Sequence, residues 1–312
     1  MSKPNCLSRR EFLKRVGGSA VALTATCLLA EAPLAFASAQ ASEEVASETP
    51  GILIDLTRCV GCNSCALACK VSNKLSEPQV VPHAFDKEVY TFVERRQGTT
   101  ASGAIKVRYV KRQCMHCQNA ACVSACPAAA MHRSAEGPVI YSPELCLGCR
   151  YCQVACPFEV PSFNWEDGVT PTISKCWLCY ERLQEGQAPA CTQACPTGAL
   201  RFGKRNELLD QAHAQITSNA GRYIDHVFGE SEVGGTSMLY LSDVPFEQLG
   251  FPANLPLTAP PEETEKIMTK LPYVIAGVAT LMTGAAIITH RSPIHDMDKG
   301  EQPQHASPKR EG

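Results

Sequence analysis

Aromatic residues are scarce in this sequence: they make up 6% of its 312 residues and include only two tryptophans. This scarcity argues against a large aromatic core. A strong excess of charge of one sign is also lacking, because 29 basic and 31 acidic residues leave a net charge of −2. A chain so close to neutral gives no reason to expect nucleic acid as a partner. No nucleophile, general base or phosphate loop can be recognised, so the sequence shows no catalytic site.

Cysteine, in contrast, is abundant. Of the 18 cysteines, Cys6 and Cys27 lie near the N-terminus, and the other sixteen fall in four tight groups. Such grouping is typical of metal sites, whose bonds to the chain also contribute to folding. The groups are Cys59, Cys62, Cys65 and Cys69; Cys114, Cys117, Cys122 and Cys126; Cys146, Cys149, Cys152 and Cys156; and Cys176, Cys179, Cys191 and Cys195.

The third group, followed by Pro157, matches the bacterial ferredoxin run C-x₂-C-x₂-C-x₃-C-P. In such a run three thiolates surround one [4Fe–4S] cluster, and the fourth cysteine ligates the neighbouring cluster. The second and fourth groups are the same run with insertions, and the first has Lys70 where the others have proline. Gly61 and Gly148 allow the backbone to come close to the inorganic sulfides. The spacing therefore predicts four [4Fe–4S] clusters on sixteen cysteines.

Zinc and disulfides are the rival interpretations of these cysteines. Zinc commonly takes two separated C-x₂-C pairs, which does not explain a recurring C-x₃-C-P. Cysteines so close on one loop rarely have the geometry of a disulfide. His116 is interpreted as packing near a cluster, since no cysteine ligand is missing, and Trp177 as an apolar cover. The sequence leaves open whether Arg150 and Lys175 raise a cluster's potential or are simply solvated.

The N-terminal segment predicts export. Arg9 and Arg10, followed by an apolar run over residues 16–30 and small residues at 35–39, are typical of a Tat signal. The Tat route carries folded proteins, which suits clusters inserted before export. Residues 1–39 are therefore interpreted as a Tat signal peptide and residues 40–50 as a linker.

The C-terminal segment predicts a membrane anchor. Residues 271–289 contain no charged side chain, and as a helix they would span roughly 28 Å, close to a bilayer core. Ala276, Thr280 and Gly284 form a stripe of small residues suited to helix contacts in lipid. A buried soluble helix is the alternative. Residues 290–312 are then a cytoplasmic tail if the Tat route places the body outside.

Secondary structure between the motifs is suggested by alternation of apolar and polar residues. Residues 88–95 and 105–112 are expected to be paired strands, and residues 139–141, 199–203 and 238–241 short strands. A helix is expected over residues 207–216. The paired strands are mostly basic, which indicates either a solvated sheet face or a docking surface for an acidic partner. The second and third groups look like one two-cluster ferredoxin unit inserted into another, which the first and fourth groups form.

The four motifs in order, the run at residues 156–161 and the run at residues 235–245 resemble the four-cluster ferredoxin-like β subunits of bacterial respiratory oxidoreductases. Within that group the chain is most similar to HybA-type subunits of periplasmic hydrogenase-2-type [NiFe] hydrogenases. The resemblance covers nearly the whole chain. It implies an α+β fold of two interleaved bacterial-ferredoxin-like units at residues 51–203, with an extension and linker at residues 204–270.

The resemblance also implies how the motifs share ligands. The four sets are Cys59, Cys62, Cys65 and Cys195; Cys176, Cys179, Cys191 and Cys69; Cys114, Cys117, Cys122 and Cys156; and Cys146, Cys149, Cys152 and Cys126. In such subunits the first two sets lie toward the catalytic subunit and the other two toward the membrane partner.

The function that the resemblance implies is electron relay, without catalysis by this chain alone. The expected partners are the small and large subunits of a periplasmic [NiFe] hydrogenase and an integral membrane quinone-reactive subunit. The expected location is the periplasmic face of the cytoplasmic membrane. One alternative is the same relay for a molybdenum enzyme such as formate dehydrogenase. Another, from a different class, is an envelope scaffold with structural zinc.

Overall fold

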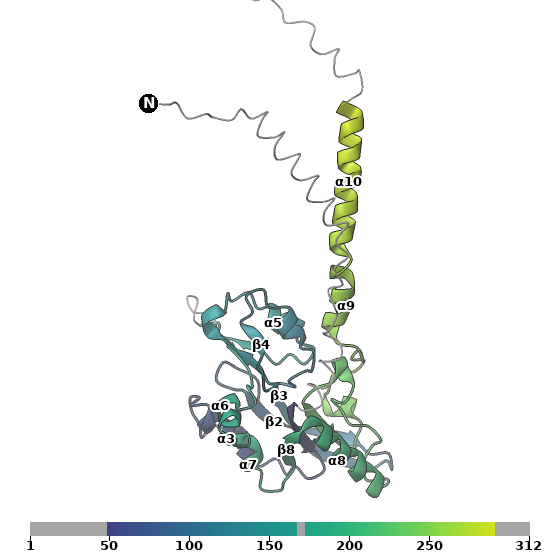
Figure 1. Cartoon of the computed structure of the whole chain (residues 1–312). Helices are drawn as coiled ribbons and strands as arrows, with labels where there is room; N and C mark the ends of the chain where they lie inside the picture. Colours follow the sequence, from purple (N-terminus) through teal and green to yellow (C-terminus); the bar gives the residue numbers. More distant parts are fainter. Residues whose placement is uncertain (1–48, 167–171, 291–312) are drawn as a thin grey trace, which may run out of the picture. The chain divides into compact units, whose positions relative to one another are not determined.

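The structure is a computed structural model that describes residues 49–166 and 172–290 (Figure 1). The Tat signal at residues 1–39, Cys6, Cys27 and the tail beyond residue 290 lie outside the described residues, as does all of the linker except Thr49 and Pro50. These predictions therefore stay as they are.

A three-stranded sheet lies at the centre of the fold, in the order β8-β1-β9. The middle strand β1, Pro50–Asp55, pairs antiparallel with β8, Leu200–Lys204, and parallel with β9, Met238–Leu241. Four of its six residues, residues 52–55, are almost fully buried, which suits an apolar strand covered on both faces. The strands expected at residues 199–203 and 238–241 are thus confirmed. Residues 204–270, expected to be an extension, supply one edge of this sheet.

The two faces of the sheet support separate cores. Ile52 and Ile54 of β1 point into the larger core, whereas Leu53 packs against Leu208 on the other face. Leu208 belongs to helix α8, Arg205–Ser218, which lies beside β8 in Figure 1. The helix expected over residues 207–216 is therefore confirmed, with two further residues at each end.

A long antiparallel hairpin leads into the second motif. It consists of β2, Thr91–Thr99, and β3, Ile105–Gln113, so the paired strands are confirmed with β2 shifted three to four residues toward the C-terminus. The basic residues of this hairpin differ in their surroundings, and the choice between a solvated face and a docking surface stays open. Arg95 and Arg96 are exposed. Arg108 donates to Asp243 with Nε–Oδ1 and Nη2–Oδ2 distances of 2.7 and 2.5 Å, and Arg112 pairs with Glu94 at 3.0 Å. Lys111 is buried, with 3% exposure.

The cysteine motifs lie on short helices that pack in pairs. Helix α3, Ser64–Ser72, packs on α7, Ala190–Gln193, and α4, Ala121–Ser124, packs on α5, Tyr151–Ala155. The first motif thus meets the fourth, and the second meets the third. The strand expected at residues 139–141 is β5. The remaining short elements are β4, Met131–Arg133; β5, Val139–Tyr141; β6, Ser162–Phe163; β7, Ile173–Ser174; α6, Tyr180–Gln184; η1, Pro143–Leu145; η2, Glu232–Gly234; and η3, Phe246–Leu249.

Four aromatic residues cluster in the larger core. Phe228, Tyr240, Phe246 and Phe251 form a continuous group whose ring centroids lie 4.6 to 6.3 Å apart. Edge-on and tilted pairs of this kind add to the stabilisation from burial. The four rings therefore form a compact aromatic group within a core that is otherwise mostly aliphatic.

The described chain ends in two consecutive helices. Helix α9, Pro260–Met268, begins with two prolines in its first turn, where a missing N–H costs nothing. Helix α10, Leu271–His290, follows almost directly. The continuous helical stretch Pro260–Ile287 is long and apolar enough to cross a membrane, and none of its most apolar window is buried within the protein.

Candidate metal centres

The four cysteine loops share one backbone feature. The residue directly before the second cysteine has a left-handed conformation in each loop, with φ of 72° at Gly61, 47° at His116, 67° at Gly148 and 56° at Leu178. Glycine adopts this conformation freely, whereas other residues incur a strain of roughly 1 kcal/mol or more. Surrounding structure holds this strain at His116 and Leu178, which are 0% and 1% exposed.

This turn directs backbone N–H groups at sulfur. The amide of Gly148 donates to Cys146 Sγ at 3.4 Å, and the amide of Leu178 donates to Cys176 Sγ at 3.3 Å. The amide of Gly61 acts on Cys59 in the same way and lowers the pKa of that thiol against the larger, opposite effect of burial. Such bonds stabilise a thiolate over a thiol, as a metal ligand requires.

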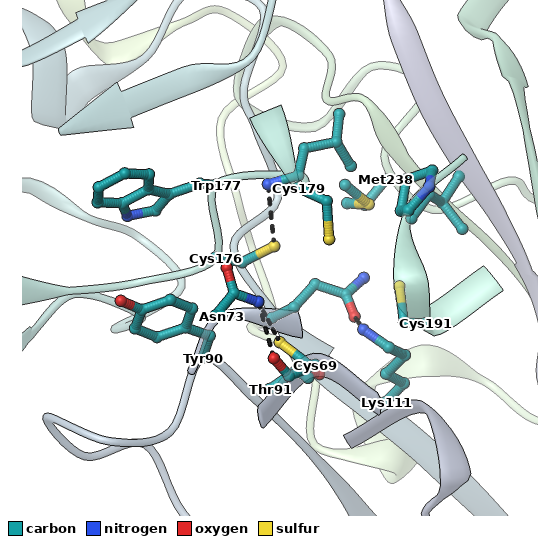
Figure 2. Close-up of a pocket in the computed structure, with 14 residues that line it drawn as sticks. Cys69, Asn73, Tyr90, Thr91, Lys111, Cys176, Trp177, Cys179, Cys191 and Met238 are labelled. Atoms are coloured by element: carbon teal, nitrogen blue, oxygen red, sulfur yellow. Dashed lines mark hydrogen bonds between the residues drawn. The ribbon is translucent and has the colours of Figure 1, made fainter. Parts of the chain in front are cut away.

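One small, largely enclosed pocket is lined by four cysteines from two motifs. Figure 2 shows their side chains pointing toward a common space, with Trp177 and Tyr90 on one side and Lys111 on another. These four are Cys69 of the first motif and Cys176, Cys179 and Cys191 of the fourth.

A second small, largely enclosed pocket is lined by Cys126 of the second motif and Cys146, Cys149 and Cys152 of the third. Its other walls include Met131, whose amide donates to Cys126 Sγ at 3.5 Å. Both cavities therefore gather three thiols from one loop and one from its partner loop.

The other eight cysteines are brought together as two further groups. Cys59 interacts electrostatically with Cys195 and Cys62, and Cys65 with Cys59 and Cys62. In the other half, Cys117 interacts with Cys114, Cys156 and Cys122. Each group again combines a loop with the last cysteine of another motif.

Burial is the main influence on these thiols. It raises the pKa of Cys65 and Cys152 to about 11 and that of Cys122 and Cys176 to about 12. Cys195 differs: burial alone would raise its pKa, but hydrogen bonds from Thr197 and the following amides outweigh burial and lower it. Loading metal on the buried thiols must therefore release protons.

The donor set fits a polynuclear iron–sulfur group better than the rivals. All sixteen cysteines are free, so no disulfide joins them. Within residues 49–166 and 172–290, no three His, Cys, Asp or Glu side chains lie close enough to hold a single metal ion. Four thiols spread around a cavity suit a cluster, whereas zinc needs its four ligands about 2.3 Å from one point.

The side chains of His116 and Trp177, which the sequence suggested as packing near a cluster, have packing positions in the structure. His116 Nδ1 accepts a hydrogen bond from the Val139 amide at 3.1 Å, and burial lowers its pKa well below the usual value. It is therefore neutral. Trp177 lines the first cavity, as expected for an apolar cover.

Arg150 and Lys175, between whose possible roles the sequence could not choose, have different surroundings in the structure. Arg150 lies over the rings of Trp165 and Phe163, with its guanidinium carbon 4.7 and 5.4 Å from their centroids. Lys175 is 1% exposed and its ammonium donates to the carbonyls of Val139 at 2.5 Å and Cys176 at 3.1 Å. Lys175 is thus buried near thiols, and Arg150 is held on an aromatic surface.

Comparison with known proteins shows which family has this arrangement of cysteine motifs. A family model for the 4Fe-4S dicluster domain matches residues 105–205. A protein of Nitratidesulfovibrio vulgaris is 40% identical over 294 residues, which cover 91% of this chain and 78% of that protein. Hydrogenase-2 operon protein HybA of Escherichia coli O157:H7 is 34% identical over 241 residues, covering 65% of this chain and 72% of HybA. The iron-sulfur subunit of nitrate-inducible formate dehydrogenase from Escherichia coli K12 is 33% identical over 271 residues, covering 81% and 89%.

The chain belongs to the HybA-like family of four-cluster ferredoxin-like iron–sulfur subunits. This iron–sulfur subunit carries four [4Fe–4S] clusters and transfers electrons for a respiratory oxidoreductase. The zinc-scaffold alternative is therefore wrong. The prediction that one ferredoxin unit is inserted into the other stays a prediction.

Two residues of the candidate centres were missed by sequence reasoning. Lys111 borders the cavity of Cys69 and Cys176, although its strand looks like a basic surface. Asn73 donates from Nδ2 to Cys69 Sγ at 3.5 Å, and only its position four residues after a cysteine could have indicated it.

Substituting Gly61 with alanine should selectively disturb the first loop. The new Cβ would lie 2.4 Å from the Tyr109 ring at a φ of +72°, so the loop must shift. We expect iron to fall by about four atoms per chain, one cluster's worth. Gly103→Ala is the control, because Gly103 has a φ of +80° but no atom within 4 Å of the added Cβ. Equal iron content in the two variants would contradict the expectation.

Proposed function

We propose that this iron–sulfur subunit conducts electrons between a periplasmic [NiFe] hydrogenase and a quinone-reactive membrane subunit. A [4Fe–4S] cluster supplies one-electron transfer when bound. The observation that carries the proposal is that Cys62 and Cys149, in different halves of the domain, are both exposed. A relay between two proteins needs two such ends.

The ligand sets that we propose follow the gathering of thiols. Cys69, Cys176, Cys179 and Cys191 would hold one cluster, and Cys126, Cys146, Cys149 and Cys152 another. The remaining two sets are Cys59, Cys62, Cys65 and Cys195, and Cys114, Cys117, Cys122 and Cys156. The chain's own contribution is to hold these thiols, direct amides at them and bury most of them from water.

The exposed ends have surfaces suited to docking. Beside Cys149, Leu147, Tyr151 and Val154 are 70%, 61% and 86% exposed. Beside Cys62, Val60 is 58% exposed. Apolar side chains left in water around a cofactor site favour coverage by a partner. We place the hydrogenase at the Cys62 end and the membrane subunit at the Cys149 end.

The location follows from the two chain ends. The Arg9-Arg10 segment supports Tat export to the periplasm, and α10 supports a single membrane anchor. Residues 290–312 would then face the cytoplasm.

Deleting the subunit tests this function. Hydrogen-dependent quinone reduction in membranes should be lost, whereas hydrogenase activity with a soluble dye should persist, because the dye takes electrons directly from the catalytic subunit. Unchanged quinone reduction would contradict the relay.

A formate dehydrogenase is the second candidate partner. It is favoured by one observation: the matching formate dehydrogenase subunit covers 81% of this chain, against 65% for HybA. Purification of the intact complex from membranes decides between them. A co-purifying nickel–iron subunit supports the hydrogenase, and a molybdenum subunit supports the alternative.

A further inference from the structure

A buried lysine lies among the thiols of the first and fourth motifs. Lys111, on β3, is 3% exposed and lines the cavity of Cys69, Cys176, Cys179 and Cys191 (Figure 2). Its ammonium donates to Gln113 Oε1. Burying an ammonium without compensating negative charge costs several kcal/mol. The position therefore calls for a source of negative charge nearby.

That charge comes from cysteines of two neighbouring ligand sets. The acidic groups that act most strongly on Lys111 are Cys191, Cys65 and Cys176. These cysteines carry negative charge as thiolates when a cluster is bound, and that charge offsets the cost of burying the ammonium. Cys191 and Cys176 belong to one proposed cluster and Cys65 to the next, so the ammonium lies close to both.

The two other groups around the ammonium are neutral and fixed. Gln113 donates from Nε2 to the Tyr240 hydroxyl at 3.3 Å, and that hydroxyl donates to the Lys111 carbonyl at 2.8 Å. Tyr240 is 1% exposed. This chain of hydrogen bonds holds the ammonium in place and leaves its positive charge directed at the thiolates.

We propose that Lys111 is a positioning residue for charge, which raises the reduction potentials of the two clusters held by the first and fourth motifs. A cluster on four thiolates gains one negative charge on reduction, and a fixed cation in a medium of low dielectric constant stabilises the more negative form. The proposal rests on the cluster assignment given above. It does not depend on which enzyme is the partner.

The test is a redox titration of the purified full complex followed by electron paramagnetic resonance. Lys111→Met removes the charge and keeps the length of the side chain. At a fixed potential, we expect the reduced-to-oxidised ratio to fall about tenfold for two of the four clusters, a shift of about 59 mV for a one-electron couple. The two clusters of the second and third motifs should not shift.

Two further variants keep the test decisive. Gln113→Glu retains Lys111 but sets a carboxylate beside its ammonium, so it should lower the same two potentials. Lys106→Met is the matched control, because Lys106 lies on the same strand, has a 44% exposed side chain and pairs with Asp243 at 2.9 Å. It should leave all four potentials unchanged.

Several results would contradict the proposed role of Lys111, and each has a different meaning. Unchanged potentials in Lys111→Met with full iron content would overturn the proposal, as would an equal shift in all four clusters or in Lys106→Met. Loss of iron from both Lys111→Met and Gln113→Glu would also overturn it and assign Lys111 to assembly. A partner other than hydrogenase would leave these outcomes untouched and would bear only on the proposed function.

Discussion

Cys62→Ala and Cys195→Ala should each lower the iron content by about four atoms per chain, and the double variant should lower it no further. The two residues are 133 positions apart in the sequence, yet we assign them to one cluster. Once that cluster is lost through one substitution, the second has nothing left to remove. Iron analysis of the purified chain, with electron paramagnetic resonance of the reduced protein, measures this.

A matched pair of variants gives the contrast. Cys62→Ala with Cys179→Ala joins residues of two different proposed sets, so the losses should add to about eight atoms. Cys62→Ala with Cys69→Ala is the sharper pair, because both lie on one motif but in different sets, and it too should lose about eight. If the double variant of Cys62 and Cys69 loses only four, the motifs do not share ligands.

Ending the chain after Lys270 should release the iron–sulfur subunit from the membrane with its iron intact. This truncation removes α10, whose apolar surface is exposed to the surroundings. About twenty predominantly apolar residues suffice to span a bilayer, and none of the α10 side chains that the structure describes belongs to the cores of the domain. We expect the subunit in the soluble fraction and a loss of quinone reduction of at least tenfold, measured in fractionated cells.

Two controls separate anchoring from general damage. Ending the chain after His290 keeps the helix and should keep the subunit in the membrane. Leu281→Arg places a charge near the middle of α10, at a cost of about 2.5–3.5 kcal/mol for insertion, and should weaken retention. If the subunit lacking α10 stays in washed membranes with full quinone reduction, α10 is not the anchor and a partner holds the subunit there.

The cysteine motifs and the short strands were predictable for clear physical reasons. Cluster ligation sets the spacing of the cysteines, so the motif can be recognised within a short stretch of sequence. Strands such as Met238–Leu241 show as apolar runs, and the helix at Arg205–Ser218 shows in the four-residue spacing of Leu208, Ala212 and Ile216. Each of these signals lies within a short stretch of the sequence, so these elements can be predicted without knowledge of tertiary contacts.

The missed features depend on contacts between distant segments. The ion pair of Arg108 with Asp243 joins residues 135 positions apart, so β3 looked like a free basic surface. Lys111 and Val110 are adjacent and both buried, which breaks the alternation expected of a half-exposed strand. The left-handed backbone at His116 also depends on its surroundings, since only a few per cent of non-glycine residues adopt it, even though histidine does so more often than most.

The place of β1 in the sheet has a consequence for the order of biosynthesis. This strand emerges from the ribosome first among the described elements, yet its neighbours β8 and β9 are made much later, and their pairing with β1 is complete only at Leu241. The nascent chain therefore cannot close its central sheet until about three quarters of its 312 residues have been synthesised. The cluster that we assign to Cys59, Cys62, Cys65 and Cys195 likewise cannot be completed before Cys195 is made, so we expect this end of the relay to be assembled late in synthesis.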